Sequence, residues 1–180
     1  GFRANIWNIG AEGQFIMGAL LSASLGLAIY PQESAILFPL MVFLGIIGGI
    51  LWALVPGILK AYFNTNEILV SLMLVYVAEQ IMAAASIGFL RNPDGAGFPG
   101  SRNLSQYPSA ANLEIIPGTG IHWGVATALI AVIFFYIILY KHKFGFQVSL
   151  SGMSPRAARL SGINPKLLVI FCLSISGGLA

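Results

Sequence analysis

Apolar residues gather in four runs of about 20 positions, separated by polar connections, and a fifth run begins near Leu167. A helix needs roughly 20 apolar residues to cross about 30 Å of hydrocarbon. We therefore expect an all-α, polytopic transmembrane helical bundle that forms one unit over residues 1–180. The predicted spans are residues 10–30, 36–55, 67–90, 121–140 and 167–180, the last of them only part of a helix.

The composition supports a membrane environment. The chain is 57% hydrophobic and 8% charged, with a mean hydropathy of +0.85, whereas a soluble domain carries about 25% charged residues. So few charges cannot solvate a globule of this size, which excludes an ordinary soluble domain. Because the chain begins with Gly1 and ends at Ala180 inside an apolar run, we expect it to be a piece of a longer membrane protein.

The basic residues indicate an orientation. Residues 141–166 contain five of the nine Lys and Arg residues and no acid, whereas residues 91–120 are rich in Gly, Pro, Ser and Asn. Cytoplasmic loops of membrane proteins carry an excess of Lys and Arg, so we expect residues 141–166 to be cytoplasmic and residues 91–120 external. The charges do not form a face that would bind nucleic acid.

Polar residues interrupt the start of the first span. Asn8, Glu12 and Gln14 are interspersed with Gly10 and Gly13, and glycine weakens a helix by about 1 kcal/mol relative to alanine, so regular helix is expected only after Gly13. Irregular backbone at membrane depth is tolerated where protein or a water-filled cavity satisfies it. The segment is therefore either a broken start that lines a polar path or a cytoplasmic helix start with Asn8 as its N-cap.

Glu79 lies near the middle of the third span, about 12 residues from either end. An intramembrane charge costs roughly 2.5–3.5 kcal/mol, so it should face the bundle interior or water. Tyr76 and Ser86 share its helical face. These three side chains either contact a polyhydroxylated solute or make a structural bond between helices.

Motifs of covalent catalysis are missing from the sequence. It has no Gly-rich phosphate loop, no Ser-His-Asp order and no Cys/His cluster, so we expect a transport protein with no cofactor or metal of its own. A secondary transporter or channel that uses Glu79 as a proton or ion site is the alternative.

Two local patterns predict helix contacts and a short helix. Gly18, Ser22 and Gly26 form a small-residue row, as do Gly45 and Gly49, and such rows allow helices to approach closely. In the basic segment, an N-cap, a first-turn proline and a C-terminal glycine predict a helix of about two turns. Its residues are Ser154, Pro155, Arg156, Ala157, Ala158, Arg159, Leu160, Ser161 and Gly162. Such a short helix needs support, either from the membrane surface or from a cytoplasmic partner.

Several segments resemble the permease subunits of ABC importers for nucleosides and simple sugars. Residues 5–14 read NIWNIGAEGQ, residues 59–68 read LKAYFNTNEI, and residues 71–74 read SLML. Residues 144–146 read FGF, and residues 152–163 read GMSPRAARLSGI. These segments follow the family's order along nearly the whole chain and look most similar to the nucleoside-type branch.

The resemblance implies a type II-like importer permease in a prokaryotic plasma membrane. Its expected partners are a cytoplasmic ATPase that binds ATP and Mg²⁺, an extracytoplasmic solute-binding lipoprotein, and a second permease subunit, identical or different. The resemblance also implies that residues 154–162 form the coupling helix that contacts the ATPase. This sequence has Ser149, Ser151 and Ser154 where the family often has a basic residue and an asparagine, and Glu79 matches no family motif.

Overall fold

The computed structural model describes residues 2–180 except 96–97, 99, 112–113 and 117. Within this part of the chain, the elements in order are η1 (Phe2–Ala4), α1 (Ala11–Ile29), α2 (Leu37–Phe63), α3 (Glu67–Ile87), η2 (Leu104–Gln106), β1 (Glu114–Ile116), β2 (Ile121–His122), α4 (Trp123–Lys141), α5 (Lys143–Met153), α6 (Pro155–Leu160) and α7 (Pro165–Gly178).

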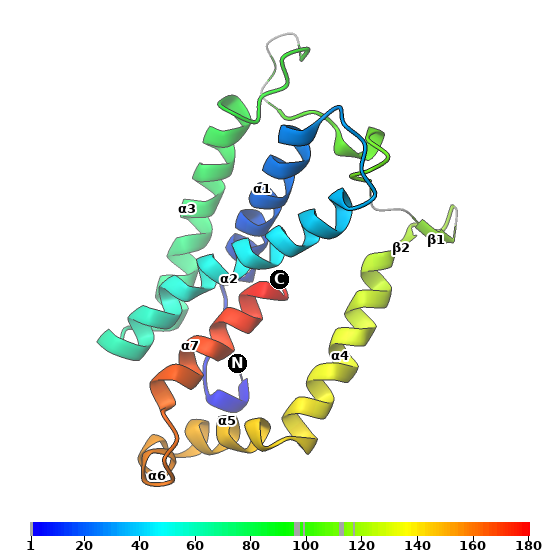
Figure 1. The fold of residues 1–180 in the computed structure, drawn as a ribbon. Helices are drawn as coiled ribbons and strands as arrows, with labels where there is room; N and C mark the ends of the chain where they lie inside the picture. The colour runs from blue at the N-terminus through cyan, green and yellow to red at the C-terminus, as the bar shows by residue number, and fades with distance from the viewer. Residues whose placement is uncertain (1, 96–97, 99, 112–113, 117) are drawn as a thin grey trace.

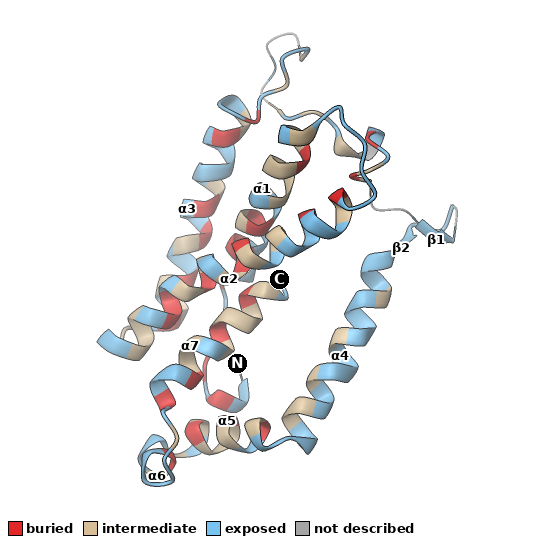
Figure 2. Cartoon of the chain, viewed as in Figure 1, coloured by how far each residue is buried: buried red, intermediate tan, exposed pale blue. Residues whose placement is uncertain are grey.

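Four helices, α1 to α4, are long and apolar enough to cross a membrane among the described residues, and α7 is a shorter apolar helix. The predicted class, a helical membrane bundle, is thereby confirmed. Many large apolar side chains of these helices are exposed, as expected where lipid rather than water covers the surface. Figure 2 shows this exposure along α3 and α4.

The second helix is longer than its predicted span, 36–55. The predicted span is the uncharged apolar run that ends at Val55, and the proline after it disfavours helical backbone in the residue before it. The structure instead continues α2 through Pro56 to Phe63, and Pro56 and Gly57 are buried where α2 packs beside α7. Tertiary packing therefore overrides the local preference, and the helix ends at Phe63, followed by the C-cap residue Asn64, which has a left-handed φ of 52°.

The bundle consists of α1, α2, α3 and α7, while α4 lies apart from it (Figure 1). No residue of α4 is buried, and the helix packs mainly on α5 and β2. The predicted small-residue rows lie at the crossings. Gly18 faces Gly45 and Gly48 between α1 and α2, and Gly49 faces α7 at Gly177.

The basic segment 141–166 is more helical than we predicted. Besides α6 it contains α5, which runs across the lower end of the bundle in Figure 1. The His142 ring accepts a hydrogen bond from the Phe144 N–H at 3.2 Å and so caps α5. Glycine and serine weaken the helical pattern of this stretch, so we did not predict α5. The helix is stabilised by packing against η1 and α4.

At the opposite end of the bundle, part of segment 91–120 covers α1 and α2. Leu37, Met41, Tyr107 and Ala110 form a buried cluster there, and the Tyr107 hydroxyl donates a hydrogen bond to the Gln32 carbonyl. Burial raises the pKa of the Tyr107 phenol above its ordinary value, with smaller contributions from nearby acidic groups, so the hydroxyl keeps its proton at neutral pH. Within this segment β1 pairs antiparallel with β2, which follows the segment at the start of the predicted fourth span, and this hairpin was not predicted.

Candidate functional site

The polar N-terminal segment enters α1 without a side-chain cap. The helix begins at Ala11, earlier than the predicted start after Gly13, and its N-cap position is Gly10 rather than Asn8. The Asn8 Oδ1 accepts a hydrogen bond from the Gly10 N–H at 3.1 Å. A Cβ at Gly10 would lie 2.8 Å from the Ser71 carbonyl oxygen, so the backbone here packs directly on α3.

Asn8 and Gln14 form a reciprocal amide pair that reaches α7. The Asn8 Nδ2 donates to the Gln14 Oε1 at 2.7 Å and to the Ser176 Oγ at 3.0 Å, and the Gln14 Nε2 donates to the Asn8 Oδ1 at 3.0 Å. Gln14 is only 1% exposed. An unpaired amide at such a site would cost about 1–3 kcal/mol, so the pair fixes the start of α1 against α7.

The other predicted path residues do not join this amide pair. Glu12 is exposed at the surface of α1. The buried stripe of α3 contains Ser71, Val75 and Ala78, and Tyr76 lies off this stripe with 58% of its surface exposed.

Glu79 and Ser86 are half-buried. Glu79 makes no hydrogen bond or ion pair with any residue that the structure describes, and the Ser86 hydroxyl donates to the Met82 carbonyl of its own helix at 2.9 Å. The expected set of converging polar residues is thus divided. Asn8 and Gln14 come together, whereas Glu12, Tyr76, Glu79 and Ser86 do not join them.

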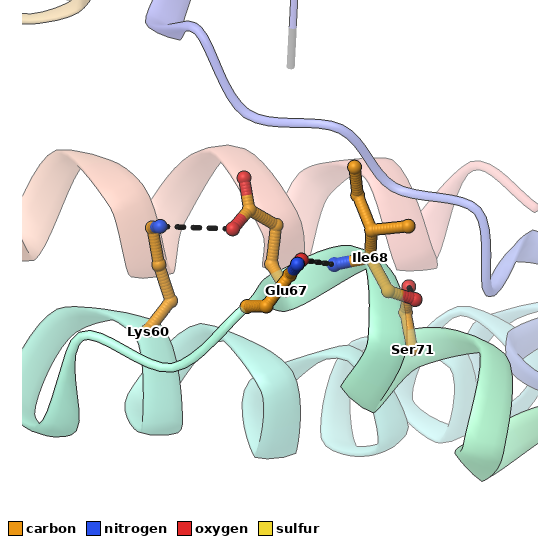
Figure 3. A network of polar contacts seen from close by, with 5 residues as sticks. Lys60, Glu67, Ile68 and Ser71 are labelled. Carbon is orange, nitrogen blue, oxygen red and sulfur yellow. Dashed lines mark hydrogen bonds and ion pairs between the residues drawn. The ribbon is translucent and has the colours of Figure 1, made fainter.

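An ion pair between α2 and α3 was missed by our sequence interpretation. The Lys60 Nζ lies 2.9 Å from the Glu67 Oε2, and the Glu67 residue is only 7% exposed. Figure 3 shows the two side chains directed toward each other across the connection between the helices. Asn66 caps α3 by accepting from the Ile68 N–H at 3.0 Å. The signal in the sequence was the opposite charge of two residues on either side of a short turn.

The short helix α6 has the N-cap and the C-terminal glycine that the sequence predicts. Its N-cap, Ser154, accepts a hydrogen bond from the Ala157 N–H at 3.3 Å. Gly162 has a left-handed φ of 77°, its N–H donates to the Arg159 carbonyl, and the Ile163 N–H donates to the Ala158 carbonyl. This pair of bonds is the Schellman arrangement that closes a helix C-terminus.

The exposed face of α6 is both basic and apolar. Arg156 and Arg159 are exposed, Leu160 is 91% exposed, and Met153 just before the helix is 86% exposed. Ala158, in contrast, is fully buried against the rest of the chain. One side of α6 is therefore buried against the rest of the chain, and the opposite side is exposed.

A metal centre is not among the features of this site. Within the described residues, no three His, Cys, Asp or Glu side chains form a group that could hold a metal ion. The chemistry that the arrangement offers is hydrogen bonding, ion pairing and apolar contact.

Comparisons with known proteins bear on the family. A family model described as the permease component of the branched-chain amino acid transport system matches residues 2–180. The chain is 31% identical over 186 residues to the glucose ABC transporter permease protein TsgB13 of Haloferax volcanii. The aligned region covers 99% of this chain and 48% of that protein.

Two further relatives are bacterial. The guanosine ABC transporter permease protein NupP of Bacillus subtilis is 29% identical over 180 residues, covering 99% of this chain and 51% of that protein. The nucleoside ABC transporter permease protein NupB of Lactococcus lactis is 26% identical over 185 residues, covering 99% and 50%. The chain therefore spans about half the length of these curated relatives.

No solved structure matches the chain significantly. The family model nevertheless covers nearly every residue, and the helical membrane bundle agrees with it. The chain belongs to the family of permease components of the branched-chain amino acid transport system.

Proposed function

We propose that this chain is part of the permease subunit of an ABC importer that passes a nucleoside or a simple sugar into a prokaryotic cell by alternating access. The proposal is supported by the family match and by relatives whose names specify glucose, guanosine and nucleoside ABC transporters. The permease itself performs no covalent chemistry. A partner ATPase binds ATP and Mg²⁺ and hydrolyses the ATP. A lipoprotein delivers the solute, and a second permease subunit completes the assembly.

The observation that carries the coupling part of this proposal is α6. The helix is too short to be stable alone, yet both of its ends are capped and Ala158 anchors it. Its free face presents two arginines beside exposed Leu160. Arginine and methionine are enriched at protein interfaces, and Met153 just before the helix is also exposed, so this face suits a cytoplasmic ATPase that pushes on α5 and α7 through the helix.

Charge reversal tests the coupling role. In the full permease assembled with its ATPase and binding protein, Arg156→Glu combined with Arg159→Glu should lower ATP-driven uptake at least about tenfold, because like-charge contacts at an interface cost several kcal/mol. The matched control is Lys141→Glu with Lys143→Glu, which makes the same charge change on exposed residues of the same segment. Equal uptake by the two double variants, at equal membrane abundance, would refute the docking role of α6.

The alternative of a secondary transporter or channel depends on Glu79. A proton-coupled carrier would lose uptake in Glu79→Gln and would need no ATPase. In our proposal the same variant retains a requirement for ATP. Uptake by wild type and Glu79→Gln, with and without ATP, separates the two mechanisms.

A further inference from the structure

A cavity of about 890 Å³ lies between α4, α5, α7 and the N-terminal η1. None of the path residues predicted from the sequence lines it. Its lining does include Ser176, which accepts a hydrogen bond from the predicted path residue Asn8. Its volume is within the range of roughly 300–1,000 Å³ that is typical of small-molecule sites. Figure 1 shows α4 and α7 as separate helices that are connected at their lower ends through α5 and α6.

Aromatic rings dominate the lining of the cavity. Six of its fifteen lining residues are Phe2, Phe134, Phe135, Tyr140, Phe144 and Phe171. They come from four separate elements. Two of the rings are fixed by an edge contact, with the Phe144 and Phe171 centroids 5.2 Å apart. Arg3 donates to the Leu139 carbonyl at 2.9 Å and lies 3.9 Å from the Tyr140 ring centroid, which joins η1 to the end of α4.

The polar capacity of the lining is small. Among the lining residues, acidic and amide side chains are absent, and the hydroxyl groups belong to Ser176 and Tyr140. The lining also contains Arg3 and His142, but Arg3 donates to the Leu139 carbonyl and the His142 ring accepts from the Phe144 N–H. Asn8 donates to the Ser176 oxygen, so this bond does not use the O–H proton of Ser176, which lines the cavity. Gln14 acts as a positioning residue, since it holds the Asn8 amide that in turn orients Ser176.

This lining suits a planar base better than a sugar ring. Each sugar hydroxyl left without a partner after burial costs about 1–3 kcal/mol, and a hexose, or the ribose of a nucleoside, would place several hydroxyls against phenylalanine. A planar base gains about 1–3 kcal/mol from stacking on one aromatic ring. We propose that this cavity binds the nucleobase of a transported nucleoside, with Phe134 and Phe171 as stacking surfaces and Ser176 as a hydrogen-bond donor.

The inference rests on the proposed function, so its test must separate the two. The full permease, assembled with its ATPase and binding protein in proteoliposomes, is photolabelled with an azido-adenosine analogue and digested for peptide mapping. Label is expected in peptides of α4 and α7, and excess adenosine or guanosine, but not glucose, should remove it.

Phenylalanine-to-leucine variants separate stacking from simple packing. Phe134→Leu and Phe171→Leu keep apolar bulk, which a lipid chain or a neighbouring helix would accept, but they remove the flat ring. Each should reduce specific labelling about tenfold. Phe43→Leu, on α2 and outside the cavity lining, is the matched control and should label as wild type does.

ATP-driven uptake of tritiated guanosine and of radiolabelled glucose is measured in the same vesicles. If guanosine is taken up but labelling is unchanged in both leucine variants, the nucleobase site is wrong and the proposed function stands. Uptake of glucose without any nucleoside would also overturn the nucleobase site. If neither solute enters with ATP, the proposed function fails and the inference fails with it.

Discussion

Gly177 on α7 meets Gly49 on α2 where the two helices cross. A Cβ at position 177 would lie 2.5 Å from the Gly49 carbonyl oxygen and in closer contact with the Ala53 methyl. Ordinary contact begins at 3.4 Å, so Gly177→Ala must move the helices apart by about 0.9 Å. Inserting a methyl group into a packed interior costs about 1–3 kcal/mol.

The same displacement reaches the amide pair. Ser176 is adjacent to Gly177, and its hydroxyl oxygen lies 3.0 Å from the Asn8 Nδ2. A shift of about 0.9 Å along this bond would stretch it beyond roughly 3.5 Å, where a hydrogen bond is lost. Gly177→Ala should therefore weaken both helix packing and the attachment of α1 to α7.

Gly124→Ala is the matched control. A Cβ at Gly124, on α4, meets no described atom within 4 Å, and the alanine brings the same gain in helix propensity. The difference between the two variants thus isolates the steric cost. At roughly 2–4 °C per kcal/mol for a domain of this size, purified Gly177→Ala should melt about 2–12 °C below Gly124→Ala. Equal apparent melting temperatures would refute the close approach of α2 and α7.

Three further predictions concern polar contacts. Lys60→Met leaves the Glu67 carboxylate buried without its cation and should destabilise the permease by about 1–2 kcal/mol. This cost is smaller than the loss of one partner of a fully buried pair, because Lys60 is partly exposed. Adding Glu67→Gln to Lys60→Met should restore most of the lost melting temperature. Gln14→Leu leaves the Asn8 amide short of a partner and should cost about 1–3 kcal/mol, measured by the same melting assay. Ser154→Ala removes the N-cap of α6 and should cost about 1 kcal/mol locally, which faster amide exchange in the first turn of α6 would reveal while the global melting temperature stays the same.

Local features were predictable from the sequence. The apolar runs predict spans because a chain in lipid must satisfy its backbone within each segment, and the observed α1, α3 and α4 begin and end within a few residues of the predicted ranges. The caps of α6 at Ser154 and Gly162 were predictable because they depend on residues only a few positions apart.

Features that depend on distant parts of the chain were not predictable. Asn8 and Ser176 are separated by 168 positions, and nothing in either segment specifies the other. The aromatic cavity likewise needs the arrangement of α4, α5 and α7. The continuation of α2 through Pro56 reflects packing on α7, which a local rule about proline cannot include.

Energy coupling is the central claim of this account, and vesicle uptake tests it most directly. The full permease is reconstituted with its ATPase and binding protein, and solute accumulation is followed with and without ATP on the ATPase side. We predict that guanosine or glucose accumulates only when both ATP and the ATPase subunit are present. Accumulation driven by a proton gradient alone, without the ATPase subunit, would contradict the account.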